Sequence, residues 1–124
     1  MISVVIIDDD ELYLKILSTS LDKNEFTVNT AQSGLRGFNV AKSVKPDIIF
    51  LDQIMPDMSG NEVLAMLKRD VKTKSIPVII FSAYYNEQIK EEAVKIGAID
   101  YLAKYNFDAS NLSNIIRKYL KQDK

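Results

Sequence analysis

Runs of continuous apolar residues alternate with segments of helical periodicity along this chain, and that alternation restricts the fold more than any other feature. Residues 2–7, 48–51 and 78–81 are runs of strand length, apolar except for Ser3 and rich in Ile and Val. Strands without polar alternation are typical of a sheet that is covered on both faces, as parallel sheets are. We therefore predict parallel strands with helices packed on both sides.

Weaker strands and several helices complete a regular β-α repeat. Further strands are expected at residues 26–31 and 99–103. Helices are expected over residues 11–21, 34–44, 61–70 and 87–96, and from a cap at Asp108 or Ser110 to about residue 120. The apolar residues expected to face the core are Leu12, Leu14, Ile16, Leu17 and Leu21 in the first helix, and Leu35, Phe38, Val40 and Ala41 in the second.

The repeats follow one another without a long linker or a low-complexity segment, so we predict a single domain over residues 1–124. Crossovers between parallel strands are right-handed, which places helices on both faces of one sheet. Of the two common doubly wound arrangements, a five-stranded chain favours the strand order 2-1-3-4-5. Ligands of such α/β folds bind beyond the carboxyl ends of the strands, next to the switch point between the first and third strands.

Composition excludes several classes of chemistry. The chain contains no Cys and no His, which rules out thiolate catalysis, a disulfide framework, a Ser-His-Asp triad and His-ligated or Cys-ligated metals. Its net charge of −1 is spread evenly, without the basic stripe that nucleic-acid binding requires. The apolar runs are too short to span a membrane, and the N-terminus does not resemble a secretory signal. We therefore expect a cytoplasmic protein that binds neither nucleic acid nor membrane.

Polar residues follow the predicted strands at the edge where their carboxyl ends meet. Residues 8–10 are Asp and follow the first strand, Asp52 follows the third, Ser82 the fourth and Lys104 the fifth. Converging carboxylates repel each other unless a hard divalent cation such as Mg²⁺ neutralises them. An Asp beside such a cation can act as a nucleophile toward a phosphoryl group, while Lys and Ser supply a positive charge and a hydrogen bond.

Each of these residues alone also suits a purely structural role. An acid before a helix is often an N-cap, and Asp10 is expected to be only a cap or a first-turn acid. Ser82 alone suits a strand-end hydroxyl with a local hydrogen bond, and Lys104 alone suits a solvated surface charge. Their convergence at one edge of one sheet is what favours a phosphoryl-transfer site.

Four segments, in order along the chain, resemble the receiver domain of two-component response regulators. They are VVIIDD at residues 4–9, IFLDQIMPDMSG at 49–60, IIFSA at 79–83 and GAIDYLAK at 97–104. As in the family's phosphorylation-site run, Met-Pro begins three residues past Asp52 and a Gly lies eight past it. The resemblance covers the whole chain, and it implies a flavodoxin-like (βα)5 fold.

The resemblance implies a role for each matching residue. Asp52 would be the phosphoacceptor, and Lys104 would contact a phosphoryl oxygen. Asp8, Asp9 and Asp52, together with the backbone carbonyl of Ile54, would hold Mg²⁺, for which Mn²⁺ could substitute. Such a protein catalyses only its own phosphotransfer and dephosphorylation, so it is not an enzyme in the usual sense.

The resemblance also implies a switch and a set of partners. Phosphorylation would draw Ser82 toward the phosphoryl group, and Tyr101 would move into the vacated space. This change would favour an active arrangement of the face made by the fourth helix, the fifth strand and the last helix. That face would bind an output domain, a target protein or a second copy of the chain, and the phosphoryl donor would be a sensor histidine kinase or a histidine phosphotransfer protein.

The sequence departs from the family pattern near the expected site. Tyr105 replaces the Pro that usually follows the Lys, and we expect a trans bond there because a cis bond costs about 3 kcal/mol before Tyr against about 1 before Pro. Ile54 and Tyr84 lie two residues past Asp52 and Ser82. Both are bulky, and neither carries a carboxylate or an amide that could orient a water molecule. We expect them to shield an acyl phosphate and to slow its self-hydrolysis.

Two other interpretations stay open at this point. A haloacid-dehalogenase-like phosphatase would use Asp8 and Asp10 as nucleophile and acid, with Ser82 and Lys104 in its later motifs. Against that class, no Gly-Thr follows the acidic pair, no second acidic motif lies downstream, and Asp52 is left without a role. The other alternative is a degenerate receiver that binds partners without phosphorylation, which the intact set of acids argues against.

Overall fold

One parallel sheet with the strand order β2-β1-β3-β4-β5 forms the centre of the protein in the computed structural model, which describes residues 1–104 and 108–122. The strands are β1 (Ile2–Ile7), β2 (Phe26–Ala31), β3 (Ile48–Asp52), β4 (Val78–Ser82) and β5 (Asp100–Ala103). The helices are α1 (Glu11–Thr19), α2 (Gly34–Val44), α3 (Gly60–Arg69), α4 (Glu87–Ile96) and α5 (Leu112–Gln122), with a short 3-10 helix, η2 (Ala109–Asn111), before α5. The predicted fold class and strand order are confirmed.

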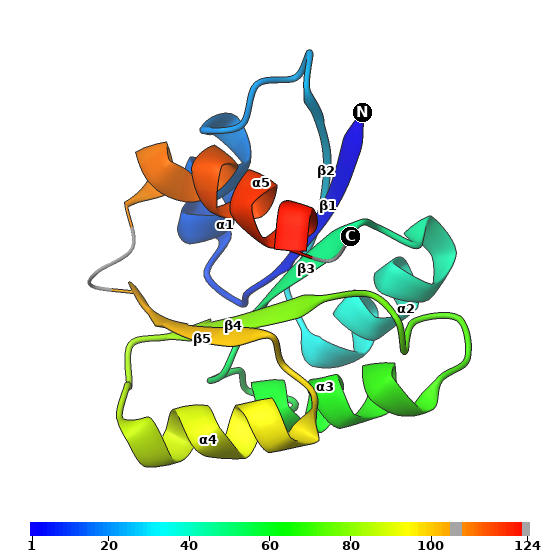
Figure 1. The fold of residues 1–124 in the computed structure, drawn as a ribbon, viewed down its shortest axis with the longest axis vertical. Helices are drawn as coiled ribbons and strands as arrows, with labels where there is room; N and C mark the ends of the chain where they lie inside the picture. The colour runs from blue at the N-terminus through cyan, green and yellow to red at the C-terminus, as the bar shows by residue number, and fades with distance from the viewer. Residues whose placement is uncertain (105–107, 123–124) are drawn as a thin grey trace.

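Helices cover both faces of the sheet, with α1 and α5 on one side and α2, α3 and α4 on the other (Figure 1). Successive side chains of a strand point to opposite faces, so each continuous apolar run contributes to two separate cores. Val4 and Ile6 of β1 pack with the α1 and α5 side, whereas Val5 and Ile7 pack with the α2, α3 and α4 side. This double burial explains why the central strands show no polar alternation.

Short polar side chains cap the first turns of several helices. Asp10 caps α1 and accepts the Tyr13 N–H, while Ser59 and Glu62 form a capping box at α3. Asn86 caps α4, and Gly97 ends that helix with a φ of 136°, a left-handed conformation that favours Gly. These caps fix where each helix leaves the carboxyl edge of the sheet.

Three apolar side chains that were expected to face the core are exposed instead. Leu12 and Ile16 of α1 keep 68% and 45% of their surface accessible, and Leu35 of α2 keeps 55%. The buried stripe of α1 is narrower than the apolar stripe of its sequence, because the helix contacts the sheet mainly through Leu14 and Leu17. The expectation for these three residues was wrong.

The carboxyl ends of the strands meet at one edge of the sheet. Ile7 of β1 pairs with Leu51 of β3, and Asp52 pairs with Phe81 of β4. Ser82 in turn pairs with Ala103 of β5. The residues that follow these pairs therefore leave the sheet side by side. No helix within residues 1–104 and 108–122 has the length and apolar character needed to cross a membrane.

Candidate functional site

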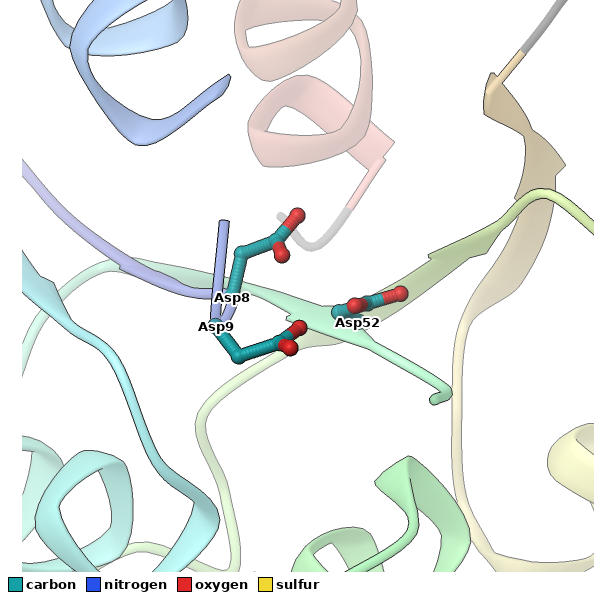
Figure 2. A group of neighbouring side chains, drawn as sticks. All are labelled: Asp8, Asp9 and Asp52. Atoms are coloured by element: carbon teal, nitrogen blue, oxygen red, sulfur yellow. The ribbon is translucent and has the colours of Figure 1, made fainter. Parts of the chain in front are cut away.

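A cluster of acids occupies the carboxyl edge, as the sequence predicted. Asp8 and Asp9 follow β1 and Asp52 ends β3, and their carboxylates point into a shared space (Figure 2). Carboxylate oxygens of the three residues all lie within 4.8 Å of one another. Asp8 is 0% and Asp52 4% exposed, whereas Asp9 is open to solvent. Two members of the cluster are therefore buried and one is open to solvent, and we call these three residues the acid pocket.

Lys104 is the cation that reaches this acid pocket from the end of β5. Its Nζ atom lies 2.9 Å from Oδ2 of Asp8 and 3.5 Å from Oδ1 of Asp52. Burial lowers the pKa of Lys104, but the hydrogen bond to Asp8 and the charge of Asp52 outweigh it and raise that pKa overall. Lys104 is therefore a charged ammonium and neutralises part of the acidic charge.

Lys104 does not balance all of the negative charge of the acids, and the pKa of Asp52 is shifted as a result. Burial, and then the negative charge of Asp8, raise the pKa of Asp52 to about 7, against the opposing effects of Lys104 and of the Ile54 N–H. A carboxylate in such surroundings ionises more readily when a further cation is present. The donors are hard carboxylate oxygens from Asp8, Asp9 and Asp52, which is the chemistry that Mg²⁺ prefers.

Ser82 and Tyr101 meet next to the acid pocket through the backbone of Tyr84. The Ser82 Oγ is fully buried and accepts the Tyr84 N–H at 3.1 Å. The hydroxyl of Tyr101, also buried, donates to the Tyr84 carbonyl at 2.8 Å. Burial raises the pKa of Tyr101, while hydrogen bonding with Ser82 and Gln53 opposes that rise. The two residues predicted to form a switch are thus in one hydrogen-bonded group.

Sequence reasoning missed two polar side chains that shape the loop after β3. Gln53 is buried, and its Oε1 accepts the Asn61 N–H at the start of α3 at 2.8 Å. Asp57 accepts the N–H groups of Gly34 and Leu35 at 3.0 and 3.1 Å, which joins the same loop to the start of α2. An acid beside a helix N-terminus is a recognisable signal, but only once the loop and α2 are known to be neighbours.

Of the four remaining predicted residues, the structure describes Ile54, Tyr84 and Asp10. Ile54 and Tyr84 are 56% and 65% exposed, so they lie at the surface rather than in the core. Asp10 stays outside the acid cluster because its carboxylate accepts the Tyr13 N–H at 3.2 Å. Tyr105, for which a trans bond is predicted, lies outside the described residues.

The fold and the acid pocket agree with one protein family. The family model described as the response regulator receiver domain matches residues 4–117. The chain belongs to this family, whose members act in two-component signalling and typically are phosphorylated and bind Mg²⁺.

Comparison with individual proteins supports the same assignment. PilH of Pseudomonas aeruginosa is 34% identical over 104 residues, which cover 84% of this chain and 86% of PilH. The transcriptional regulator RpaA of a Synechocystis strain is 34% identical over 119 residues, which cover 96% of this chain but 49% of RpaA. The receiver domain of Francisella response regulator 1452 is 27% identical and matches all of both chains with a TM-score of 0.88. The chain thus spans most of one relative and about half of the other.

Proposed function

We propose that this chain accepts a phosphoryl group on Asp52 in a Mg²⁺-dependent reaction. One observation carries the proposal: the Asp52 carboxylate lies within 4.8 Å of carboxylate oxygens of Asp8 and Asp9 and 3.5 Å from the ammonium of Lys104. Asp8, Asp9 and Asp52, with the carbonyl of Ile54, would hold Mg²⁺, or Mn²⁺ in its place. The bound ion supplies charge that lets an anionic phosphoryl group approach the carboxylate.

The chain's own residues then position the reaction. An oxygen of Asp52 attacks phosphorus, and the bond from phosphorus to the donor's nitrogen or oxygen breaks with its electron pair leaving on the donor. Lys104 needs only a short movement from Asp52 to contact a transferred phosphoryl oxygen, because its Nζ already lies 3.5 Å from the Asp52 carboxylate. Ser82 donates its hydroxyl hydrogen to another phosphoryl oxygen.

The same residues would transmit the signal. When Ser82 turns toward the phosphoryl group, its hydroxyl gives up the hydrogen bond from the Tyr84 N–H. Tyr101 donates to the carbonyl of the same residue, Tyr84, so a shift of the Tyr84 backbone moves Tyr101 as well. Tyr101 belongs to β5, one of the elements of the face formed by α4, β5 and α5. Asp100 of β5 joins its elements, because it pairs with Lys90 of α4 at 3.5 Å and accepts a hydrogen bond from Tyr119 of α5. A movement of Tyr101, the neighbour of Asp100 in β5, can therefore alter the contacts of β5 with both α4 and α5.

We place the protein in the cytoplasm as a single receiver domain over residues 1–124. Its donor would be a sensor histidine kinase or a histidine phosphotransfer protein. Its output would be a domain, a target protein or a second copy bound at the α4-β5-α5 face, without direct contact to nucleic acid. The reaction is its own phosphorylation and dephosphorylation rather than turnover of a separate substrate.

The decisive experiment measures intact mass after incubation with acetyl phosphate, with and without Mg²⁺. The wild type is expected to gain one phosphoryl group only with Mg²⁺, and Asp52→Asn is expected to gain none. Asp10→Asn is the matched control, because Asn caps α1 as well as Asp does and the change lies outside the acid cluster.

The control also separates the proposal from the phosphatase alternative, which needs Asp10 as its acid. Loss of phosphorylation in Asp10→Asn, or hydrolysis of a phosphate ester that survives Asp52→Asn, would favour that alternative. A folded wild type that gains no mass under any of these conditions would favour the phosphorylation-independent receiver.

The lifetime of the phosphoryl group is a second prediction. Ile54 sits exposed beside Asp52 and offers no group that orients water, so slow self-dephosphorylation is expected. Ile54→Asn adds an amide that can hydrogen-bond a water molecule, a contact of about 1 kcal/mol, and should speed phosphate loss by roughly fivefold to tenfold. Intact-mass decay after removal of acetyl phosphate measures this rate. Ile54→Leu, which keeps the bulk, should match the wild type, and an unchanged rate in Ile54→Asn would count against shielding by Ile54.

A further inference from the structure

Two aromatic rings lie against the ammonium group of Lys104. Its Nζ is 4.7 Å from the centre of the Tyr13 ring and 5.2 Å from the centre of the Phe81 ring. The two rings are themselves 5.7 Å apart with an interplanar angle of 37°. A cation this close to an aromatic ring is attracted by its electrons, and the attraction strengthens as water is excluded. We call this pair of rings the aromatic cradle.

The cradle is built on fixed parts of the fold. Phe81 lies in β4 next to Ser82, is almost fully buried, and packs edge-on to the ring of Phe50 at 6.4 Å. Tyr13 lies in the first turn of α1, where the side chain of Asp10 accepts its N–H. The rings therefore approach Lys104 from a strand and from a helix, two elements on which the Lys104 side chain itself does not lie.

We infer that Tyr13 is a positioning residue for phosphorylation, whose ring, together with that of Phe81, holds the Lys104 ammonium at the edge of the acid pocket. This inference rests on the proposed function, in which Lys104 contacts the phosphoryl group. It adds a residue to which neither the sequence motifs nor the family match gives a role.

The acids alone do not provide a lasting hold on Lys104. Among the described residues, the carboxylates in contact with Lys104 are those of Asp8 and Asp52, whose oxygens would also bind Mg²⁺ and the phosphoryl group. When those oxygens are engaged, the ion pairs that restrain the flexible Lys stem weaken. The rings of Tyr13 and Phe81 are ligands of neither Mg²⁺ nor the phosphoryl group. Their attraction to the Lys104 ammonium therefore persists when the carboxylates are occupied.

The cradle also compensates for a feature of the sequence. The residue after Lys104 is Tyr105 where receivers usually have Pro, so the chain lacks the rigid imino acid that restrains the backbone beside the Lys. Support of the Lys104 head group by Tyr13 and Phe81 restrains the side chain at its other end.

The ring of Tyr13, rather than its hydroxyl, is expected to carry this role. Within the part of the chain that the structure describes, the buried Tyr13 hydroxyl has no hydrogen-bond partner. Burial, followed by the charges of Asp8 and Asp52, raises the pKa of Tyr13 to about 12, so the phenol stays neutral beside the acids. A Phe at this position should therefore serve as well as Tyr.

Tyr13→Leu and Tyr13→Phe form the test pair: Leu removes the ring but leaves an apolar side chain, whereas Phe keeps the ring and removes only the hydroxyl. With acetyl phosphate and Mg²⁺, the maximal phosphorylation rate of Tyr13→Leu is expected to fall about tenfold, whereas Tyr13→Phe keeps the wild-type rate. In the Mg²⁺-free protein, NMR should show the ε-methylene protons of Lys104 shifted upfield by the rings. That shift should shrink in Tyr13→Leu and persist in Tyr13→Phe. Thermal unfolding of each variant checks that the fold is retained.

The NMR measurement tests the cradle even if no phosphoryl group is ever transferred, so it separates this inference from the proposed function. A wild type without phosphorylation but with ring-shifted Lys104 protons would overturn the positioning role together with the proposed function. A phosphorylated wild type whose rate and Lys104 shift are unchanged in a folded Tyr13→Leu would overturn this inference alone. Equal losses in Tyr13→Phe and Tyr13→Leu would also overturn it, since they would assign the effect to the hydroxyl.

Discussion

Alanine at Gly60 is expected to destabilise the protein by about 3 kcal/mol, while the same substitution at Gly34 should cost clearly less. A Cβ atom on Gly60 would lie 2.6 Å from the backbone oxygen of Asp52 and 2.8 Å from the Cα of Gln53. Both are backbone atoms at the end of β3, so relief of the clash must move α3 away from the strand or distort the strand itself. A Cβ on Gly34 would meet the side chains of Val63 and Met58, at 2.8 and 3.0 Å, which can shift.

The two glycines make a matched pair because each is the first residue of its helix. Thermal and urea unfolding of both variants measure the difference, and Gly60→Ala is expected to lower the melting temperature by roughly 10 °C. Gly60→Ala should also slow phosphorylation, since the displaced carbonyl belongs to Asp52. Equal destabilisation by the two substitutions would show that the approach of α3 to β3 is not the source of the effect.

Asparagine at Asp52 is expected to stabilise the metal-free protein at pH 8 and to leave its stability nearly unchanged at pH 4. The folded-state pKa of Asp52 is raised to about 7, above the ordinary value of 3.8 that applies to the unfolded chain. Between these values the folded protein binds a proton that the unfolded chain does not, so wild-type stability falls as the pH rises from about 4 to about 7. Above that range the full cost of the ionised carboxylate is present, and the amide removes it.

Urea unfolding across this pH range, with a chelator present, measures the effect. We expect a gain of about 2 kcal/mol for Asp52→Asn at pH 8, a figure that allows for solvent screening in a pocket where Asp9 is open to solvent. Mg²⁺ should stabilise the wild type at pH 8 far more than Asp52→Asn, because the ion offsets the same cost. Asp10→Asn reports the generic effect of replacing a carboxylate by an amide. A gain for Asp52→Asn that does not depend on pH would contradict the assignment of the cost to ionisation.

The fold could be predicted because its strongest signals are local. Strands β3 and β4 are buried over their whole length, and only a parallel sheet with two covered faces accommodates such runs. The predictions that were wrong concern residues at the margins of a helical stripe or at a helix end. Leu12 and Ile16 satisfy the helical period of α1 but fall outside its contact with the sheet, whose width the period does not specify. Asp108 caps η2 rather than a continuous last helix, because a single turn of 3-10 helix precedes α5.

The site was predictable to the extent that its residues follow strands. Asp8, Asp52 and Lys104 come directly after, or at the end of, strands whose carboxyl ends must meet, so their convergence follows from topology alone. Tyr13 lies on α1, and the role of Gln53 comes from its contact with the start of α3, so both depend on the angle at which these helices pack beside the strand ends. No spacing in the sequence records that angle, so these residues become visible only in three dimensions.

The contact between Lys104 and Asp8 joins residues 96 positions apart, near the two ends of the domain. A ribosome releases the acids of β1 long before it releases Lys104, and the chain folds as a unit once the last strand is available. Under the proposed function, a nascent copy that still lacks Lys104, or a partly unfolded copy in which Lys104 is separated from the acids, cannot respond to its kinase. Only copies that have completed folding are therefore expected to be phosphorylated, and a damaged copy produces no signal rather than a false one.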